Sequence, residues 1–243
     1  MILAILGIII GFVNGLTGAG GALIAIPLLM QFLGMSLKEA SLYSLIAIVI
    51  ASLSNFYYQR KNAHISLATL LVTSSGIGSY LTLPYKELIS NQGIAILLTI
   101  IALYSLYSVW FPIRKNENKS DKKINNLVTV VIGLLLGTIT TFTGLGGGVL
   151  MLPLLINIYS LPQTQAVATS LVVIGLSSLA SFLIQALNVG INLHWDFTYL
   201  MIGILVTPYI LKSLTSRLFP QTINNLRKIL FTIVVGLALL KIF

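Results

Sequence analysis

The sequence predicts an all-α membrane protein made of two inverted repeats, each with a glycine-broken re-entrant helix pair and three transmembrane helices. Three observations predict it. Of the 243 residues, 57% are hydrophobic and 8% are charged, and the mean hydropathy is +1.00, whereas a soluble domain carries about 25% charged residues. A glycine-rich segment occurs twice along the chain. The basic residues lie in short loops between apolar runs, as topology signals do.

The glycine-rich segment reads TGAGGA from Thr17 and TGLGGG from Thr143, and a Pro-Leu-Leu follows each copy, at Pro27 and Pro153. The constant spacing of 126 residues indicates one internal duplication. Each copy divides an apolar run into two pieces of about 14 residues, shorter than the ~20 residues that one crossing needs. Each pair of pieces is therefore expected to form a re-entrant hairpin.

Three apolar segments follow each hairpin, and each is long enough, at about 20 residues, to cross a bilayer. The hairpin pieces are predicted at 2–15, 20–33, 127–142 and 147–160, and the spans at 40–58, 64–84, 92–112, 163–187, 194–214 and 223–242. The predicted organisation is a first transmembrane repeat at 1–113, a polar linker at 114–125 and a second transmembrane repeat at 126–243.

The distribution of the 14 Lys and Arg residues predicts the orientation. If each hairpin enters and leaves by one face, 11 of them lie on the side of the linker and 3 lie on the other side, namely Lys38, Lys86 and Lys241. If each glycine segment lay in one continuous crossing, the division would be 8 to 6. Because basic residues favour the cytoplasmic side, the first arrangement is preferred. It places the linker in the cytoplasm and both termini outside, and it makes the two halves inverted.

The glycine segments form the predicted substrate site. Glycines break a helix, and the helix that restarts after the break directs its positive end inward, where it favours an anion. No Asp, Glu, Lys or Arg lies in the middle of a predicted span, so neutral hydroxyl, amide and backbone N–H groups remain as ligands. The alternative is that the glycines are helix-packing faces and that the polar side chains join helices. The candidate substrate-binding residues are Asn14, Thr17, Gly18, Gly20, Gly21, Ser44, Thr141, Thr143, Gly144, Gly146, Gly147, Gly148 and Ser170.

Other polar residues of the spans belong to the same neutral set: Asn55, Thr140, Thr169 and Gln185. Two histidines, His64 and His194, lie at the starts of the spans predicted at 64–84 and 194–214. We expect them to be interfacial or capping residues rather than proton carriers, although a histidine near a cavity can titrate near neutral pH. The absence of cysteine excludes disulfides and thiolate metal sites.

At these motifs the chain resembles the sulfite exporter TauE/SafE family of membrane permeases. The resemblance is carried by the duplicated glycine segments with their trailing prolines, Pro27 and Pro153, and by the tail from Ser213 to Phe243, with Arg217 and Leu226-Arg227 before a last apolar segment. It implies transport of small organic or inorganic anions, often sulfur oxyanions such as sulfite or sulfonates. The chain departs from the family pattern at 63–67 and 190–195, and this leaves the particular anion open.

The leading hypothesis is a secondary carrier or exporter of small anions in the cell membrane, with both termini extracytoplasmic. A passive anion channel is the alternative, and a membrane assembly factor is a further one. An enzyme would need a nucleophile, an acid/base pair or a metal site, and no such set converges here. We expect no cofactor and no nucleic-acid partner. The expected partners are the small anion, the lipid bilayer and, as an open question, further copies of the chain.

Overall fold

The computed structural model describes residues 2–17, 21–110, 125–189 and 196–215, together with positions 222, 225–226, 228–229, 232–233 and 236. Most of these residues are helical, and none of them lies in a strand. The predicted segments agree with the observed helices to within a few residues. The linker before Asn125, most of the span at 223–242 and His194 lie outside the described residues. The helices are α1 Ile2–Thr17, α2 Ala22–Leu33, α3 Leu37–Gln59, η1 Arg60–Asn62, α4 Ile65–Thr82, η2 Leu83–Leu88, α5 Asn91–Trp110, α6 Asn126–Thr143, α7 Gly148–Asn157, α8 Gln163–Val189 and α9 Asp196–Thr215.

Side chains in the sequence fix where several helices begin. A capping box opens α3, because Ser36 Oγ accepts from Glu39 N–H and the Glu39 carboxylate accepts from Ser36 N–H at 2.9 Å. Asn125 caps α6 by accepting from Leu127 N–H at 3.1 Å. His64 is the N-cap of α4 and accepts from the backbone N–H of Leu67. The expectation that His64 is a capping residue is thus confirmed.

Four helical segments are long and apolar enough to cross a membrane: Leu37–Asn62, Ile65–Lys86, Asn126–Thr143 and Gln163–Leu187. The third of these is the first half of a predicted hairpin, so at 18 residues it is longer than a half-crossing requires. By contrast, α2 has 12 residues and α7 has 10. At a rise of 1.5 Å per residue, α2 and α7 reach only about half of a hydrocarbon core of about 30 Å.

Glycines bring helix backbones into contact at two places that the duplication relates. Along α1 and α9, a Cβ on Gly7 would collide with Leu200 O, and one on Gly203 would collide with Ala4 O. Along α6 and α4, a Cβ on Gly137 would collide with Ser75 O. Such close approach is the usual role of small residues in membrane helices. These glycines, which lie outside the repeated motif, are therefore packing residues.

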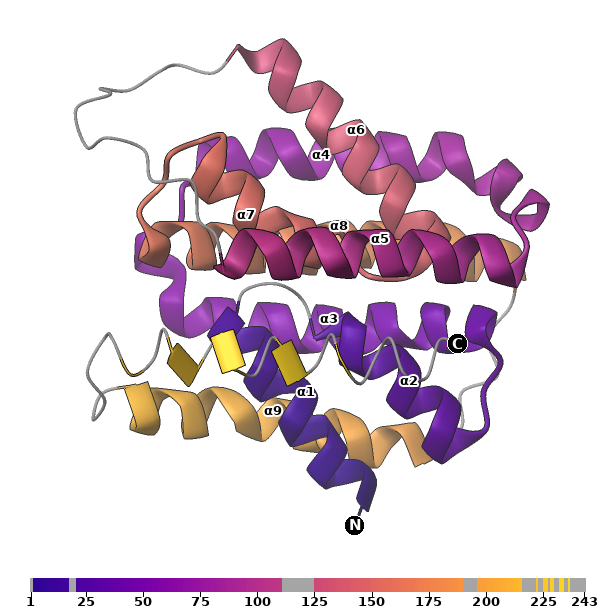
Figure 1. The fold of residues 1–243 in the computed structure, drawn as a ribbon, viewed down its shortest axis with the longest axis horizontal. Helices are drawn as coiled ribbons and strands as arrows, with labels where there is room; N and C mark the ends of the chain where they lie inside the picture. The colour runs from indigo at the N-terminus through magenta and orange to yellow at the C-terminus, as the bar shows by residue number, and fades with distance from the viewer. Residues whose placement is uncertain are drawn as a thin grey trace.

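The strongest helix pairs join the two predicted repeats rather than neighbours within one repeat. Helix α1 packs along α9, and its counterpart α6 packs along α4, while α3 and α8 pack against each other in the centre (Figure 1). One group of helices therefore contains α1, α2, α3 and α9, and the other contains α4 to α8 (Figure 1). Each group draws helices from both halves of the sequence.

Helices α4 and α8 run in the same direction, and this shows which basic residues lie at the same end of the molecule. The His64 N–H donates to Thr169 Oγ1 near the start of α8 at 2.9 Å, while Lys86, after the end of α4, donates to Gln185 near the end of α8. Helix α3 returns in the opposite direction, because η1 joins it tightly to α4. Lys38, in the first turn of α3, thus lies at the same end as Lys86.

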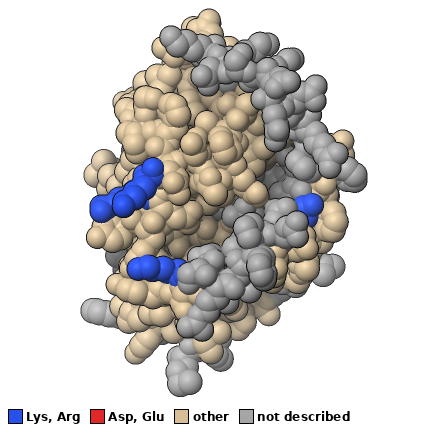
Figure 2. Space-filling view, turned by 90° about the vertical axis from the view of Figure 1, so that its left-hand side faces the viewer, with Lys and Arg blue, Asp and Glu red and all other residues tan. Residues whose placement is uncertain are grey.

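The other end of the molecule carries basic and aromatic residues. The rings of Tyr58 and Tyr209 lie 5.7 Å apart in an edge arrangement, and Lys212 Nζ lies 5.8 Å from the centre of the Tyr58 ring. Arg60 and Lys61 follow in η1. The end of α9 that carries Lys212 is on the left of Figure 1, and Figure 2 looks onto that side, where basic but no acidic side chains are visible among the residues drawn in colour.

Candidate functional site

The second glycine segment forms the turn between α6 and α7, and three of its glycines have left-handed backbone. The φ angles of Gly144, Gly146 and Gly147 are +70°, +65° and +66°. For a residue with a Cβ, left-handed backbone costs roughly 1–2 kcal/mol of conformational free energy, so the turn favours glycine at all three positions. The Gly144 N–H closes α6 by donating to Thr140 O at 2.8 Å. The break that the sequence predicts is therefore a tight turn inside the packed core.

Helix α7 begins at Gly148 with no side-chain cap. Its N-cap is Gly147, a residue without a side chain that could accept from the first turn. The first N–H groups of a helix lack partners inside the helix, and with the helix dipole they attract negative charge. The Gly148 N–H is used, since it lies 3.3 Å from Leu145 O. The Met151 N–H donates to Gly147 O at 3.1 Å, so the two N–H groups between Gly148 and Met151 are the element on which an anion site can be built.

Two serine hydroxyls lie within hydrogen-bond distance of carbonyl groups of this turn. Ser44 Oγ on α3 lies 2.8 Å from Gly144 O and 2.7 Å from Ser41 O on its own helix, and Ser177 Oγ on α8 lies 3.4 Å from Gly146 O and 3.2 Å from Ile174 O. Both serines are buried. Ser44 was predicted from the sequence as a ligand, and in the structure it contacts the glycine backbone of the turn itself.

Two other serines lie against the turn with no hydrogen-bond partner for Oγ in the described part of the chain. They are Ser41 on α3, whose backbone and Cβ crowd Gly144, and Ser178 on α8, whose Oγ lies beside the Cα of Gly146. Ser41 is 2% exposed and Ser178 is 0% exposed. A buried polar group without a partner costs roughly 1–3 kcal/mol, so a ligand that accepted from these hydroxyls would recover that free energy.

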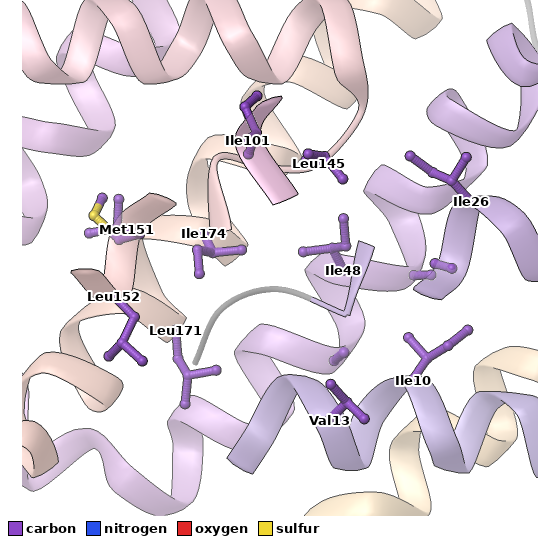
Figure 3. Close-up of a cluster of buried hydrophobic side chains, with 14 of the residues drawn as sticks. Ile10, Val13, Ile26, Ile48, Ile101, Leu145, Met151, Leu152, Leu171 and Ile174 are labelled. Carbon is purple, nitrogen blue, oxygen red and sulfur yellow. The ribbon is translucent and has the colours of Figure 1, made fainter. Parts of the chain in front are cut away.

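Apolar side chains close the space between the turn and the rest of the core. Ile48 of α3, Ile174 of α8 and Leu145 of the turn point toward a common space (Figure 3). Ile48 and Ile174 occupy equivalent positions in the duplication and are both fully buried. A Cβ on Gly146 would lie 3.4 Å from Ile48 and 3.5 Å from Ile174. The turn is therefore surrounded by hydroxyl groups and hydrocarbon.

Most of the predicted hydroxyl ligands of the second repeat donate a hydrogen bond to a backbone carbonyl of their own helix. A hydroxyl that donates to a carbonyl offers a ligand only acceptor lone pairs, which an anion does not need. This points to the backbone N–H groups and the unpartnered serines as the donors. The bonds are Thr140 to Leu136 O at 2.7 Å, Thr141 to Gly137 O at 3.1 Å, Thr143 to Ile139 O at 2.7 Å and Ser170 to Val167 O at 2.8 Å.

The first glycine segment is described only at its edges. Thr17 ends α1, Gly21 is the N-cap of α2, and Gly18, Gly20 and the Thr17 side chain lie outside the described residues. Helix α2 also begins with no side-chain cap. The φ angle of Gly21 is −64°, and a Cβ there would lie 2.7 Å from Ile10 O. Gly21 therefore acts at least as a packing residue between α1 and α2.

Amides that the sequence offered as ligands make helix contacts around the first segment. Asn14 Nδ2 donates to Ser52 Oγ at 2.9 Å, and its Oδ1 has no partner within the described chain. Asn55 Nδ2 donates to Gly11 O at 3.2 Å and to Ala51 O at 2.7 Å. Asn14 thus combines a bond between helices with an unpartnered acceptor, whereas Asn55 joins α3 to α1.

Sequence reasoning missed Ser41 and Ser178. Ser178 lies 126 residues after Ser52, but the bond of Ser52 to Asn14 is a feature of the fold, so the sequence alone marked neither Ser52 nor Ser178. The contact of Ser41 with Gly144 likewise arises from the packing of α3 against the turn.

The model of one protein family, sulfite exporter TauE/SafE, matches residues 3–240 of this chain. The chain is 25% identical over 218 residues to the probable membrane transporter protein YunE of Bacillus subtilis, covering 79% of this chain and 80% of that protein. It is 24% identical to a probable membrane transporter protein of Xylella fastidiosa (98% and 92% covered) and 25% identical to one of Haemophilus influenzae (96% and 95%). No solved structure matches.

Proposed function

This chain belongs to the sulfite exporter TauE/SafE family, and on that premise we propose that it is a secondary carrier of small anions, with sulfur oxyanions such as sulfite and organosulfonates as the substrate class. One observation carries the proposal. The turn between α6 and α7 combines an uncapped helix start with the buried, unpartnered hydroxyls of Ser41 and Ser178. Backbone N–H and hydroxyl groups are donors suited to an oxyanion.

The proposed site draws on both glycine segments. The second segment supplies the start of α7, and the first supplies the uncapped start of α2. Helices α3 and α8 pack together in the centre, and Ile48 of α3 and Ile174 of α8 both lie near Gly146. The anion would be bound between the two turns, near the membrane midplane, as in other carriers with broken helices.

The inverted arrangement of the repeats is supported by the exchange of helix partners. With the spacing of 126 residues, helices α1, α2, α3 and α4 correspond to α6, α7, α8 and α9. Exchanging each helix for its counterpart changes the pair of α1 and α9 into the pair of α6 and α4, and the described structure contains both pairs. It turns the contact of α2 with α3 into that of α7 with α8, which is also present. A two-fold relation of this kind allows the two groups of helices to rock against each other around one site.

The orientation with the 114–125 linker in the cytoplasm is supported by the charges at the two ends. Arg60, Lys61 and Lys212 gather at one end, and Lys38 and Lys86 lie at the other. This grouping is the one that the hairpin arrangement requires, and the positive-inside rule assigns the first end to the cytoplasm. Reporter fusions in the linker and at Phe243 test the orientation. A cytoplasmic report from Phe243 would reject it.

Uptake by proteoliposomes tests the function. The purified protein would be offered labelled sulfite, an organosulfonate and a carboxylate, with and without a pH gradient and with and without the same anion inside. A carrier gives saturable uptake that a trapped internal anion accelerates. A channel gives flux without such exchange, and the absence of flux for all three anions would reject the proposal.

A further inference from the structure

Lys86 is the charged side chain that is buried among those the structure describes. It is 8% exposed, although its neighbours Tyr85 and Leu88 in η2 are 59% and 78% exposed. The short helix η2 therefore lies at the surface, and Lys86 is the side chain that it directs inward. Placing an ammonium in an apolar interior is costly unless it is paired or used, so its position calls for a partner.

Gln185 of α8 is one partner of Lys86, and its amide N–H groups are further hydrogen-bond donors. Lys86 Nζ donates to Gln185 Oε1, so the amide Nε2 of Gln185 does not take part in this bond. Gln185 is 1% exposed, and its Nε2 has no hydrogen-bond partner within the described residues. A cation and an amide N–H group beside each other form the donor set that binds an oxyanion.

Polar residues connect this pair to the glycine turn. On α8, Ser178, Ser181 and Gln185 are spaced by three and four residues, so they lie on one face of the helix. Ser178 Oγ lies beside Gly146, and Gln185 contacts Lys86. The distance along the helix between the two ends of this row is about 10 Å.

A matching row on α4 faces the row on α8. Ser79, Thr82 and Lys86 are again spaced by three and four residues. Ser79 Oγ lies 2.7 Å from Ser181 Oγ, and Thr82 Oγ1 lies 3.0 Å from Thr138 Oγ1 on α6. The hydroxyl groups of the two rows are buried. Buried polar side chains of α4 and α8, here called the polar seam, therefore lie between Gly146 and Lys86.

We propose that Lys86 and Gln185 form a second anion site, at the end of the molecule opposite to Arg60 and Lys212, which captures or releases the anion at the outer end of the polar seam. The inference deepens the proposed function and rests on it. The ammonium supplies long-range attraction, which raises the local concentration of anions. The neutral seam then lets the anion pass to the glycine turn without being held by a second full charge.

The competing explanation is that the seam only joins helices, as serine and threonine often do in membranes. The substitution Gln185→Glu separates the two. It keeps the size of the side chain, removes the free N–H donors and gives Lys86 a carboxylate partner. If the seam only joins helices, the Gln185→Glu variant keeps both the stability and the transport of the wild type. If Lys86 and Gln185 bind an anion, the variant keeps its stability and loses affinity for the anion.

The test is uptake of labelled sulfite by proteoliposomes of the wild type, Gln185→Glu, Lys86→Met and Lys86→Arg. We expect the apparent KM of Gln185→Glu and Lys86→Met to rise by about tenfold or more, because a charge-assisted bond is lost, while Lys86→Arg stays within about threefold. Two matched controls should stay within about twofold. Gln59→Glu makes the same change at the position 126 residues earlier, and Lys38→Met removes a lysine at the same end.

The outcomes are distinct. If the wild type takes up no sulfite, organosulfonate or carboxylate, the proposed function fails and this inference fails with it. If the wild type transports and Gln185→Glu melts at the wild-type temperature or above with an unchanged KM, only the second site is rejected. A rise in KM as large in Gln59→Glu and Lys38→Met as in Gln185→Glu would also reject it, since the effect would then be one of net charge.

Discussion

The two glycine turns occupy equivalent places in the duplication, yet their neighbouring polar residues are used differently. Beside the first turn, Asn14 Nδ2 donates to Ser52 Oγ at 2.9 Å. Beside the second, Thr140 stands in the place of Asn14 and donates to its own helix, and Ser178, in the place of Ser52, has no partner for Oγ within the described chain. The duplication thus keeps the helix break, while the second turn alone keeps a buried hydroxyl without a protein partner among the described residues.

The difference indicates that an anion would find its strongest donors at the second turn. A bond between Asn14 and Ser52 stabilises the packing of α1 against α3, whatever is bound. The hydroxyl of Ser178 gains a partner only when something else enters the space beside Gly146. We therefore expect substitutions at the first turn to act mainly on stability and those at the second to act mainly on anion affinity.

The largest effect is expected from Gly144→Ala. The residue has φ +70°, and a Cβ would meet the backbone of Ser41, which cannot move aside. Strain and overpacking of about 1–3 kcal/mol each should add. We expect little folded protein in a thermal unfolding assay in detergent. A variant that melts within about 2 °C of the wild type would contradict the left-handed turn.

Gly147→Ala should separate binding from strain. A Cβ at Gly147 would lie 3.3 Å from Thr140 Oγ1, a tight contact that a small shift of this side chain relieves, so most of the cost to stability is the left-handed strain of about 1–2 kcal/mol. Anion affinity should fall by about tenfold, because a residue that leaves the left-handed conformation reorients the N–H groups at the start of α7. Binding of sulfite to the purified variant by calorimetry measures this.

Gly34→Ala is the matched control for that strain. Gly34 has φ +63° and nothing within 4 Å of a built Cβ, and it ends α2 far from α7 in the sequence. It should lose the same left-handed strain, about 1–2 kcal/mol, and keep its affinity for sulfite. Equal affinities in the two variants would show that the second turn does not contact the anion.

The pair Ser178→Ala and Ser52→Ala tests the comparison directly. Removing the Ser178 hydroxyl should lower anion affinity by about tenfold, since hydrogen bonds to charged groups are worth about 1.5–3 kcal/mol, and should leave thermal stability unchanged or slightly higher. Ser52→Ala should do the reverse, with a loss of about 1 kcal/mol in stability and little change in affinity. If both variants lose only stability, the hydroxyl of Ser178 serves packing.

The smallest effect is expected from Thr140→Val. The Thr140 hydroxyl donates to Leu136 O on its own helix, and that carbonyl also takes part in the helix ladder. Its removal should change stability by less than about 0.5 kcal/mol and sulfite affinity by less than about twofold. A larger loss of affinity in the same calorimetric assay would show that Thr140 contacts the anion and that the two turns are more alike than the unbound geometry indicates.

The course of the helices was predictable from the sequence because local signals define it. The capping pair of Ser36 and Glu39 begins α3, His64 begins α4, and the glycines at 144–147 end α6. Apolar runs and breaks along the chain contain this information without any reference to the fold.

The partners of the helices were not predictable in the same way. The contact of α1 with α9 depends on glycines at Gly7 and Gly203, each of which looks like an ordinary small residue in an apolar run. Likewise, Lys86 reads as a loop residue, and only the packing of η2 against α8 buries it beside Gln185. Burial and pairing depend on the whole arrangement, so a local pattern does not encode them.

The pairing of α1 with α9 has a consequence for the synthesis of the protein. Thr207 on α9 contacts Ile8 on α1 across 199 residues of chain. At a translation rate of 5–20 residues per second, α1 leaves the ribosome roughly 10–40 s before the helix it packs against. During that interval its glycine face has only lipid or an insertion factor to cover it. Assembly of this permease is thus completed late, and a nascent chain that stalls before α9 offers quality-control proteases a first helix whose α9-facing side is uncovered.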